Sequence, residues 1–130
     1  MEKSKNNMVG WFEIPVSDME RAIRFYETVF QIDLCRQQMG PLDMAMFPWN
    51  ETGFGTTGAL VFHMDYYKPQ SNGVLIYFTS RAGDVNDELS RIEITGGSIV
   101  QVKTRISDDI GYMAVIIDCE GNRIALHSRA

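Results

Sequence analysis

The chain is poor in the residues that build a covalent or metal-bound framework. Its 130 residues include only two cysteines and two histidines. Neither pair has the close spacing of a disulfide scaffold or a zinc site. Cys35 and Cys119 are therefore expected to be reduced, buried thiols of a cytoplasmic protein.

Long apolar runs and clusters of basic residues are also missing. The longest apolar runs, 58–62 and 73–78, are far shorter than the ~20 residues that span a bilayer. The first ten residues are polar and lack the apolar segment of a secretion signal. Twelve Lys and Arg against seventeen Asp and Glu give a net charge of -5, without the clustered cations that phosphate contacts need. We therefore expect a soluble protein that binds neither membranes nor nucleic acid.

The hydrophobic content is sufficient for one folded domain over residues 1–130. Hydrophobic residues make up 45% of the chain, which is typical of a globular protein. A globule of this size buries roughly two thirds of its unfolded surface, so it needs no disulfide or metal to stay folded. Residues 1–7 are polar and predict a flexible lead-in.

The order strand, helix, strand, strand, strand occurs twice along the chain. Residues 17–20 have the spacing of a capping box ahead of a helix that extends to residue 30, and Gly96-Gly97 ends a helix over 84–95. The first module is expected at about 8–64, a linker at 65–73 and the second module at about 74–128. The expected strands are 9–16, 32–39, 42–48 and 59–64, then 74–79, 98–103, 112–118 and 123–127.

Three stretches resemble the vicinal oxygen chelate superfamily, which includes glyoxalase I, bleomycin-resistance proteins and extradiol dioxygenases. They are residues 12–30 (FEIPVSDMERAIRFYETVF), residues 117–128 (IDCEGNRIALHS) and the strand–helix–Gly-Gly order of 74–97. The likeness covers nearly the whole chain and is nearest to small glyoxalase-related members of unknown activity. It implies an α+β fold in which two βαβββ modules form a curved mixed sheet around a cleft, and it implies a homodimer.

The same resemblance bears on metal binding. Metal-using members hold a divalent ion through His and Glu side chains on the first and last strands of each module, where it polarises two substrate oxygens. The matching positions here are Trp11 and Phe62, and 63 residues further on Val74 and Ala125. None of the four side chains can ligate a metal, and His63 beside Phe62 would be a lone ligand. We therefore expect no metal and no other cofactor.

Strand alternation places polar residues beside these positions. Residues two apart on a strand share a face, so Glu13 accompanies Trp11, while Arg123 and His127 accompany Ala125. A few polar groups among apolar walls are typical of a small-molecule site. The alternative is that Glu13 and Arg123 are surface residues or an ion pair, and that both histidines are ordinary strand residues. The candidate pocket residues are Trp11, Glu13, Leu60, Phe62, Arg123, Ala125 and His127.

Two other patterns have simpler explanations. The glycines at 53, 55 and 58 match the dinucleotide-binding spacing, but a strand follows them instead of a helix, which indicates a loop. Ser128 and His127 are neighbours on a strand and face opposite sides, so they do not form a nucleophile pair. Met44 and Met46 alternate with Ala45 and Phe47, and either pair can face the cleft.

Three functions fit these observations. The first is a metal-free protein that binds a small, partly aromatic molecule, as bleomycin-resistance relatives do. The second is a glyoxalase-related lyase or isomerase with Glu13 or His127 as the acid or base. The third is a non-enzymatic, dimeric interaction module.

Overall fold

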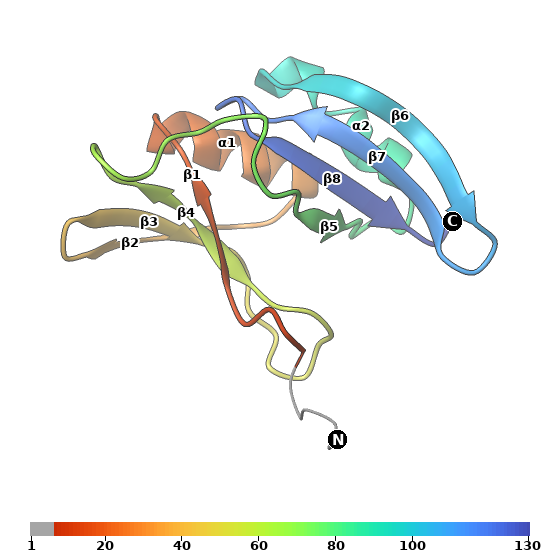
Figure 1. The fold of residues 1–130 in the computed structure, drawn as a ribbon, viewed down its shortest axis with the longest axis horizontal. Coiled ribbons are helices and arrows are strands. Elements are labelled where there is room, and N and C mark those ends of the chain that lie inside the picture. Colours follow the sequence, from red (N-terminus) through yellow and green to blue (C-terminus); the bar gives the residue numbers. More distant parts are fainter. Residues whose placement is uncertain (1–6) are drawn as a thin grey trace.

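The chain folds into two modules of four strands each, and the computed structural model describes residues 7–130 (Figure 1). Residues 1–6 of the expected lead-in lie outside the described residues. Module one contains β1 (Phe12–Pro15), α1 (Met19–Phe30), β2 (Cys35–Met39), β3 (Leu42–Met46) and β4 (Gly58–Phe62). Module two contains β5 (Tyr77–Thr79), α2 (Val85–Leu89), the 3-10 helix η1 (Glu93–Thr95), β6 (Ser98–Ser107), β7 (Gly111–Ile117) and β8 (Arg123–Ser128).

The two sheets have the same topology. Their strand orders are β1-β4-β3-β2 and β5-β8-β7-β6. In each sheet the first strand pairs in parallel with the last one, and the other pairs are antiparallel. The predicted α+β fold of two βαβββ modules is confirmed. This order leaves β1 and β5 at an edge of their sheets, and both edges lie at the junction of the modules.

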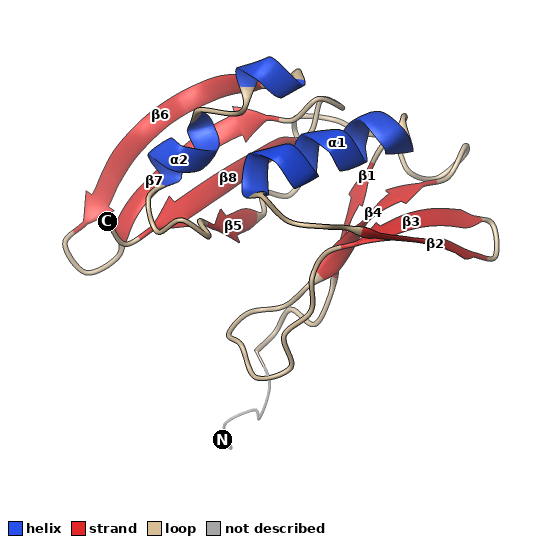
Figure 2. Ribbon diagram, turned by 180° about the vertical axis from the view of Figure 1, so that it is seen from behind, coloured by secondary structure: helices blue, strands red, loops and turns tan. Residues whose placement is uncertain are grey.

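Helix α1 is the element that joins the modules. Asp18 is its N-cap and accepts a hydrogen bond from the backbone N–H of Arg21 at 3.1 Å. The helix ends at Gln31, whose φ of 56° is left-handed. Seen from behind, both helices lie in front of the strands (Figure 2). None of the helices in residues 7–130 has the length and apolar character that a bilayer crossing requires.

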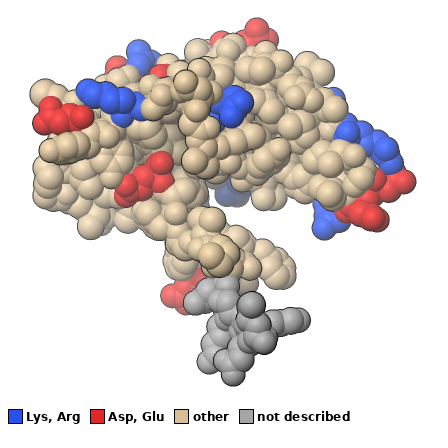
Figure 3. Space-filling model, viewed as in Figure 1, with Lys and Arg blue, Asp and Glu red and all other residues tan. Residues whose placement is uncertain are grey.

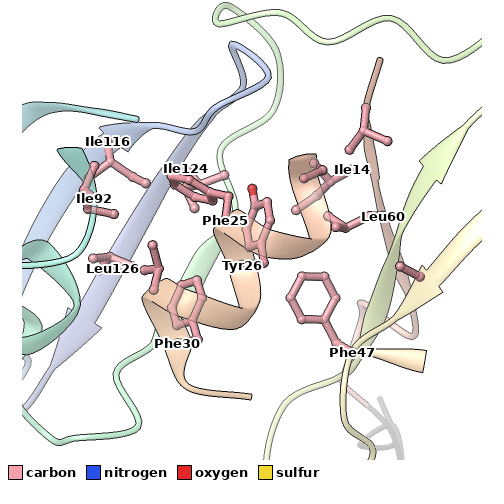
Figure 4. Packing of buried hydrophobic residues seen from close by; sticks show 14 of the residues in the cluster. Ile14, Phe25, Tyr26, Phe30, Phe47, Leu60, Ile92, Ile116, Ile124 and Leu126 are labelled. Carbon is pink, nitrogen blue, oxygen red and sulfur yellow. The ribbon is translucent and has the colours of Figure 1, made fainter. Parts of the chain in front are cut away.

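One hydrophobic core extends through both modules. Figure 4 shows α1 between the two sheets, with Ile14 and Leu60 on one side and Ile116 and Ile124 on the other. Phe25 of α1 is fully buried in this core. The buried residues of α1 are Met19, Ala22, Phe25, Tyr26, Val29 and Phe30.

The second helix is shorter than the sequence predicts. The expected helix over 84–95 divides into α2 and η1, because the Ser90 hydroxyl donates to the Asp87 carbonyl at 2.6 Å and competes with helical hydrogen bonds. The Arg91 guanidinium donates instead to the Val29 carbonyl at the end of α1, at 2.7 Å. A loop–helix segment of module two therefore caps the helix of module one.

The expectation that both thiols are buried is wrong for Cys35. Cys35 is exposed because β2 is an edge strand, and all five of its residues lie outside the core. Cys119 is partly buried in the turn between β7 and β8.

Candidate functional site

An apolar groove of about 860 Å³ lies at the junction, along the edges of β1 and β5. Four phenylalanine rings form its floor, with neighbouring centroids 5.0–5.7 Å apart: Phe12, Phe30, Phe47 and Phe78. Three further aromatic residues, all of them exposed, form its rim: Trp11, Phe54 and Tyr77. Sites for small molecules commonly have volumes of ~300–1,000 Å³ and mostly apolar walls, so this groove has the size and character of a ligand site.

Among residues 7–130, Glu13 is the one carboxylate that lines this groove. Its Oε1 accepts a hydrogen bond from the Tyr67 hydroxyl at 2.5 Å, and its Oε2 accepts one from the Trp11 indole N–H at 3.3 Å. The hydrogen bond to Glu13, with some burial, raises the pKa of Tyr67 above its usual range, so Tyr67 remains a donor at neutral pH. The two donors hold the carboxylate in one orientation.

The strand register decides which side chains share the face of Glu13. Glu13 pairs with Ala59, whereas Ile14 pairs with Leu60 on the side that α1 covers. Leu60 is fully buried in the core, and Phe62 packs against the same core. The prediction that Leu60 and Phe62 wall the cleft is therefore wrong. The expected alignment was off by one residue in β4, and a one-residue shift moves every side chain of a strand to the other face.

The same register shows which face of the first sheet carries Met44 and Met46. Met46 pairs with Ala59 and Met44 with Val61, so both methionines lie on the open face of the first sheet, where Tyr67 packs beside them. A second apolar hollow of about 780 Å³ covers this face and shares Trp11 and Glu13 with the groove.

In module two the three predicted residues share a face but not a site. Ala125 pairs with Tyr77, and His127 pairs with Thr79. Arg123 lines a small hollow of about 220 Å³, which it shares with Glu13. Ala125 is fully buried, and the Nε2–H of His127 donates to the Ile110 carbonyl at 2.6 Å. The structure therefore places Glu13 beside Trp11 in the groove and beside Arg123 in the small hollow, but leaves Ala125 and His127 outside both.

The residues predicted at the four family metal positions do not fit a divalent ion. Trp11 and Val74 both line the groove, but an indole and an isopropyl group offer no lone pair to a metal. Phe62 lies on the helix-covered side and Ala125 is buried without a ligand atom. Within residues 7–130, no group of three or more His, Cys, Asp or Glu lies close enough together to hold a metal ion.

Other reactive groups are engaged in the structure. Burial, with a contribution from the neighbouring Glu120, raises the pKa of the Cys119 thiol to about 12, so it is a poor nucleophile. The Ser128 hydroxyl accepts from the Val85 N–H at 3.1 Å and donates to the Ala130 carbonyl at 2.9 Å. Neither side chain is available for nucleophilic chemistry.

Sequence reasoning missed the floor of the groove and the partner of Glu13. Phe12 and Phe78 alternate onto the helix side of their strands, yet they line the groove because both strands are edges. Tyr67 lies in the linker, 54 residues from Glu13, and no local pattern connects the two. The glycine-rich loop forms part of the rim through residues 54–57, as a loop and not as a nucleotide cradle.

Comparison with known proteins identifies the family. Residues 8–126 match the model of the Glyoxalase/Bleomycin resistance protein/Dioxygenase superfamily. The chain belongs to this superfamily. The resemblance to vicinal oxygen chelate proteins is thereby confirmed over nearly the whole chain. No curated protein matches the sequence at a significant level.

Solved structures of superfamily members share the fold. Glyoxalase I from Zea mays is 17% identical with a TM-score of 0.68, and the match covers 92% of this chain but 45% of the maize protein. This chain thus spans less than half the length of that enzyme. TnmS3, an antibiotic binding protein from Streptomyces sp. CB03234, is 25% identical with a TM-score of 0.68 over 98% of this chain and 100% of TnmS3. A glyoxalase-related enzyme from Fulvimarina pelagi is 14% identical with a TM-score of 0.69, and the match covers 95% of this chain and 88% of the Fulvimarina protein.

Proposed function

We propose that this superfamily member binds a small, largely apolar molecule in the groove between β1 and β5. The observation that carries the proposal is the wall of the groove, where the described residues supply seven aromatic rings and only two charged side chains, Glu13 and Arg81. Aromatic pairs contribute ~0.5–1.5 kcal/mol each beyond the burial of their area. A ligand that contains a ring would gain the free energy of burying its apolar area and that of its contacts with the aromatic side chains. The likeness to a protein described as antibiotic binding supports ligand binding on this fold.

Tryptophan fluorescence tests the proposal directly. Trp11 is on the rim, and the only other tryptophan, Trp49, can be removed by Trp49→Phe. We expect uncharged bicyclic and tricyclic aromatic compounds to change the Trp11 emission and to raise the melting temperature. At a ligand concentration of 100 Kd the stabilisation is about 2.7 kcal/mol.

A matched variant connects that signal to the groove. Tyr77 is half exposed on the rim, and Tyr77→Ala should weaken binding without disturbing the core. Tyr66→Ala, an equally drastic change at an exposed tyrosine that does not line the groove, should leave binding unchanged. Compounds that alter neither emission nor melting temperature in any variant would contradict the proposal.

Glu13 favours a second candidate function, proton transfer in a lyase or isomerase. It is the carboxylate of the groove, and a general base must lie within hydrogen-bond reach of the proton it abstracts. His127 is a poorer candidate because its Nε2–H is bonded to the Ile110 carbonyl, away from the groove. Glu13→Gln should abolish any turnover while preserving binding of an uncharged ligand. Unchanged turnover in this variant would exclude the acid–base role.

A further inference from the structure

We infer that the groove selects ring-bearing ligands that carry a protonated amine, with the carboxylate of Glu13 as the group that recognises the cation. This inference rests on the proposed binding function and adds the ligand's charge class to it. It is argued from the surroundings of Glu13, from the free acceptor sites on its carboxylate and from the rings beside it.

Glu13 lacks a cationic partner among the described residues. Six ion pairs form in residues 7–130, and none of them includes Glu13. Lys68 and Arg123 line the small hollow on the far side of Glu13, but neither brings a nitrogen within 4 Å of its carboxylate, and Lys68 donates to the Met64 carbonyl at 2.5 Å. Among residues 7–130, no ion pair neutralises the negative charge of Glu13 at the groove.

The carboxylate is both fixed and incompletely used. Two oxygens of an ionised carboxylate offer about four acceptor sites. Tyr67 and Trp11 occupy two of them, one on each oxygen. The remaining sites can accept the N–H groups of an ammonium or amidinium ion. Because the acceptor is already oriented, little ordering of Glu13 is needed when a ligand binds.

The rings beside Glu13 favour the same ligand class. A cation over the face of a tryptophan or tyrosine is attracted by the ring, by ~0.5–1 kcal/mol at exposed sites and more when desolvated. Trp11, which donates to Glu13, and Tyr77 both lie on the rim. Uncharged residues make up most of the face seen in Figure 3. The side chains that line the groove beside Glu13 are mainly apolar, so an aromatic body finds apolar surface next to the charge. Arg81 is the one cation that the described part of the chain places in the groove wall, and it disfavours a second positive group on the ligand.

Two planar tricyclic probes of opposite charge test the inference: proflavine, a cation at pH 7, and anthraquinone-2-sulfonate, an anion. Binding of each is measured by isothermal titration calorimetry at low and at high salt. We expect the wild-type protein to bind proflavine more tightly than the sulfonate. Glu13→Gln should weaken proflavine binding at least about tenfold, since hydrogen bonds to charged groups contribute ~1.5–3 kcal/mol. In the same variant, the affinity for the sulfonate should be unchanged or higher.

Glu20→Gln is the matched control, because it changes the net charge equally at a side chain that is 85% exposed. It should alter proflavine affinity less than twofold. Tyr67→Phe removes one donor that orients Glu13 and leaves the charge in place, so it should weaken binding a few-fold. This second variant keeps the test decisive if Glu13→Gln were to lose its fold.

The outcomes separate the inference from the function on which it rests. Equal proflavine affinity in the wild type, Glu13→Gln and Tyr67→Phe, or tighter binding of the sulfonate than of proflavine, overturns the cation preference and leaves groove binding in place. Absence of binding by either probe and by the uncharged aromatic compounds overturns both.

Discussion

At the scale of single residues, Glu120 links the turn of module two to the start of α1. Its Oε1 accepts from the backbone N–H groups of Ser17 and Asp18, each at 2.8 Å, and from the Ser17 hydroxyl at 3.0 Å. Its Oε2 accepts from Arg21 Nε at 2.6 Å. The capping box expected within residues 17–20 is therefore replaced by Asp18 as N-cap and by a carboxylate from about a hundred residues away.

We predict that Glu120→Ala lowers the free energy of unfolding by about 1.5–3 kcal/mol, because it removes the charged acceptor of hydrogen bonds from two backbone N–H groups and the Arg21 guanidinium. The side chain of Glu120 is fully buried, whereas Arg21 is partly exposed. Chemical denaturation measures the change. Glu20→Ala, at an exposed carboxylate in the first turn of the same helix, should change stability by less than about 0.5 kcal/mol. Equal effects of the two substitutions would refute the role of Glu120.

The pH dependence of stability follows from the same carboxylate. Burial opposes ionisation of Glu120, but the Arg21 guanidinium and the Asp18 and Ser17 amides outweigh it and lower its pKa from 4.5 to about 2. A carboxyl group whose pKa is lower in the folded state than in the unfolded state stabilises the fold at pH values above the unfolded-state pKa. This stabilisation is lost as the pH falls towards the folded-state pKa. We predict that stability declines between about pH 4.5 and pH 2, and that Glu120→Gln makes this decline shallower. A decline of equal slope in both proteins, measured by denaturation at several pH values, would contradict the prediction.

At the scale of elements, the parallel pair β1–β4 depends on a close backbone approach. A Cβ at Gly58 would lie 2.2 Å from the Phe12 carbonyl oxygen and 2.6 Å from the Phe12 ring. Phe12 pairs with Gly58 in the ladder and also forms the floor of the groove. The third glycine of the apparent nucleotide-binding pattern therefore serves strand pairing.

We predict that Gly58→Ala destabilises the protein by about 1–3 kcal/mol, the usual range for overpacking, and weakens ligand binding because Phe12 must shift. Gly73→Ala is the control, because a Cβ there meets nothing within 4 Å. Thermal melts and the Trp11 titration measure the two effects. A Gly58→Ala protein as stable as the control would show that β1 and β4 are further apart than described.

At the scale of the whole molecule, the shared core makes the two modules one unit. Tyr26 of α1 donates to the Asp118 carboxylate of module two at 2.6 Å, and both side chains are buried. Burial, followed by the nearby charge and hydrogen bond of Asp118, raises the pKa of Tyr26 well above its usual value, so the phenol stays protonated. The sheets thus cannot separate without exposing α1 and breaking this bond.

We predict one cooperative unfolding transition. Both tryptophans, Trp11 and Trp49, lie in module one, whereas far-ultraviolet circular dichroism reports on both modules. The denaturant midpoints from fluorescence and from circular dichroism should therefore coincide. Separate midpoints would show that the modules unfold independently.

The homodimer stays a prediction, which light scattering of the purified protein would test.

Much of the architecture follows from local patterns. The repeated order of strand, helix and three strands predicted two βαβββ modules, and the family resemblance implied their sheet topology. Alternation also placed Trp11 with Glu13, and Arg123 with His127, on common faces, since side chains two apart on a strand must share a side.

The composition of the site depends on how the elements pack. The register of β4, which differs by one residue from the expected alignment, turns Leu60 and Phe62 towards the core. The edges of two strands meet at the module junction, so residues that alternation assigns to the core form the floor of the groove. The hydrogen bond from Tyr67 to Glu13 joins positions that only the folded chain brings together. Local patterns depend on neighbours a few residues apart, whereas register, edge position and cross-module contacts depend on how complete elements pack. Local patterns are therefore sufficient to predict the modules and the faces of most strands, whereas packing determines which of those faces line the groove.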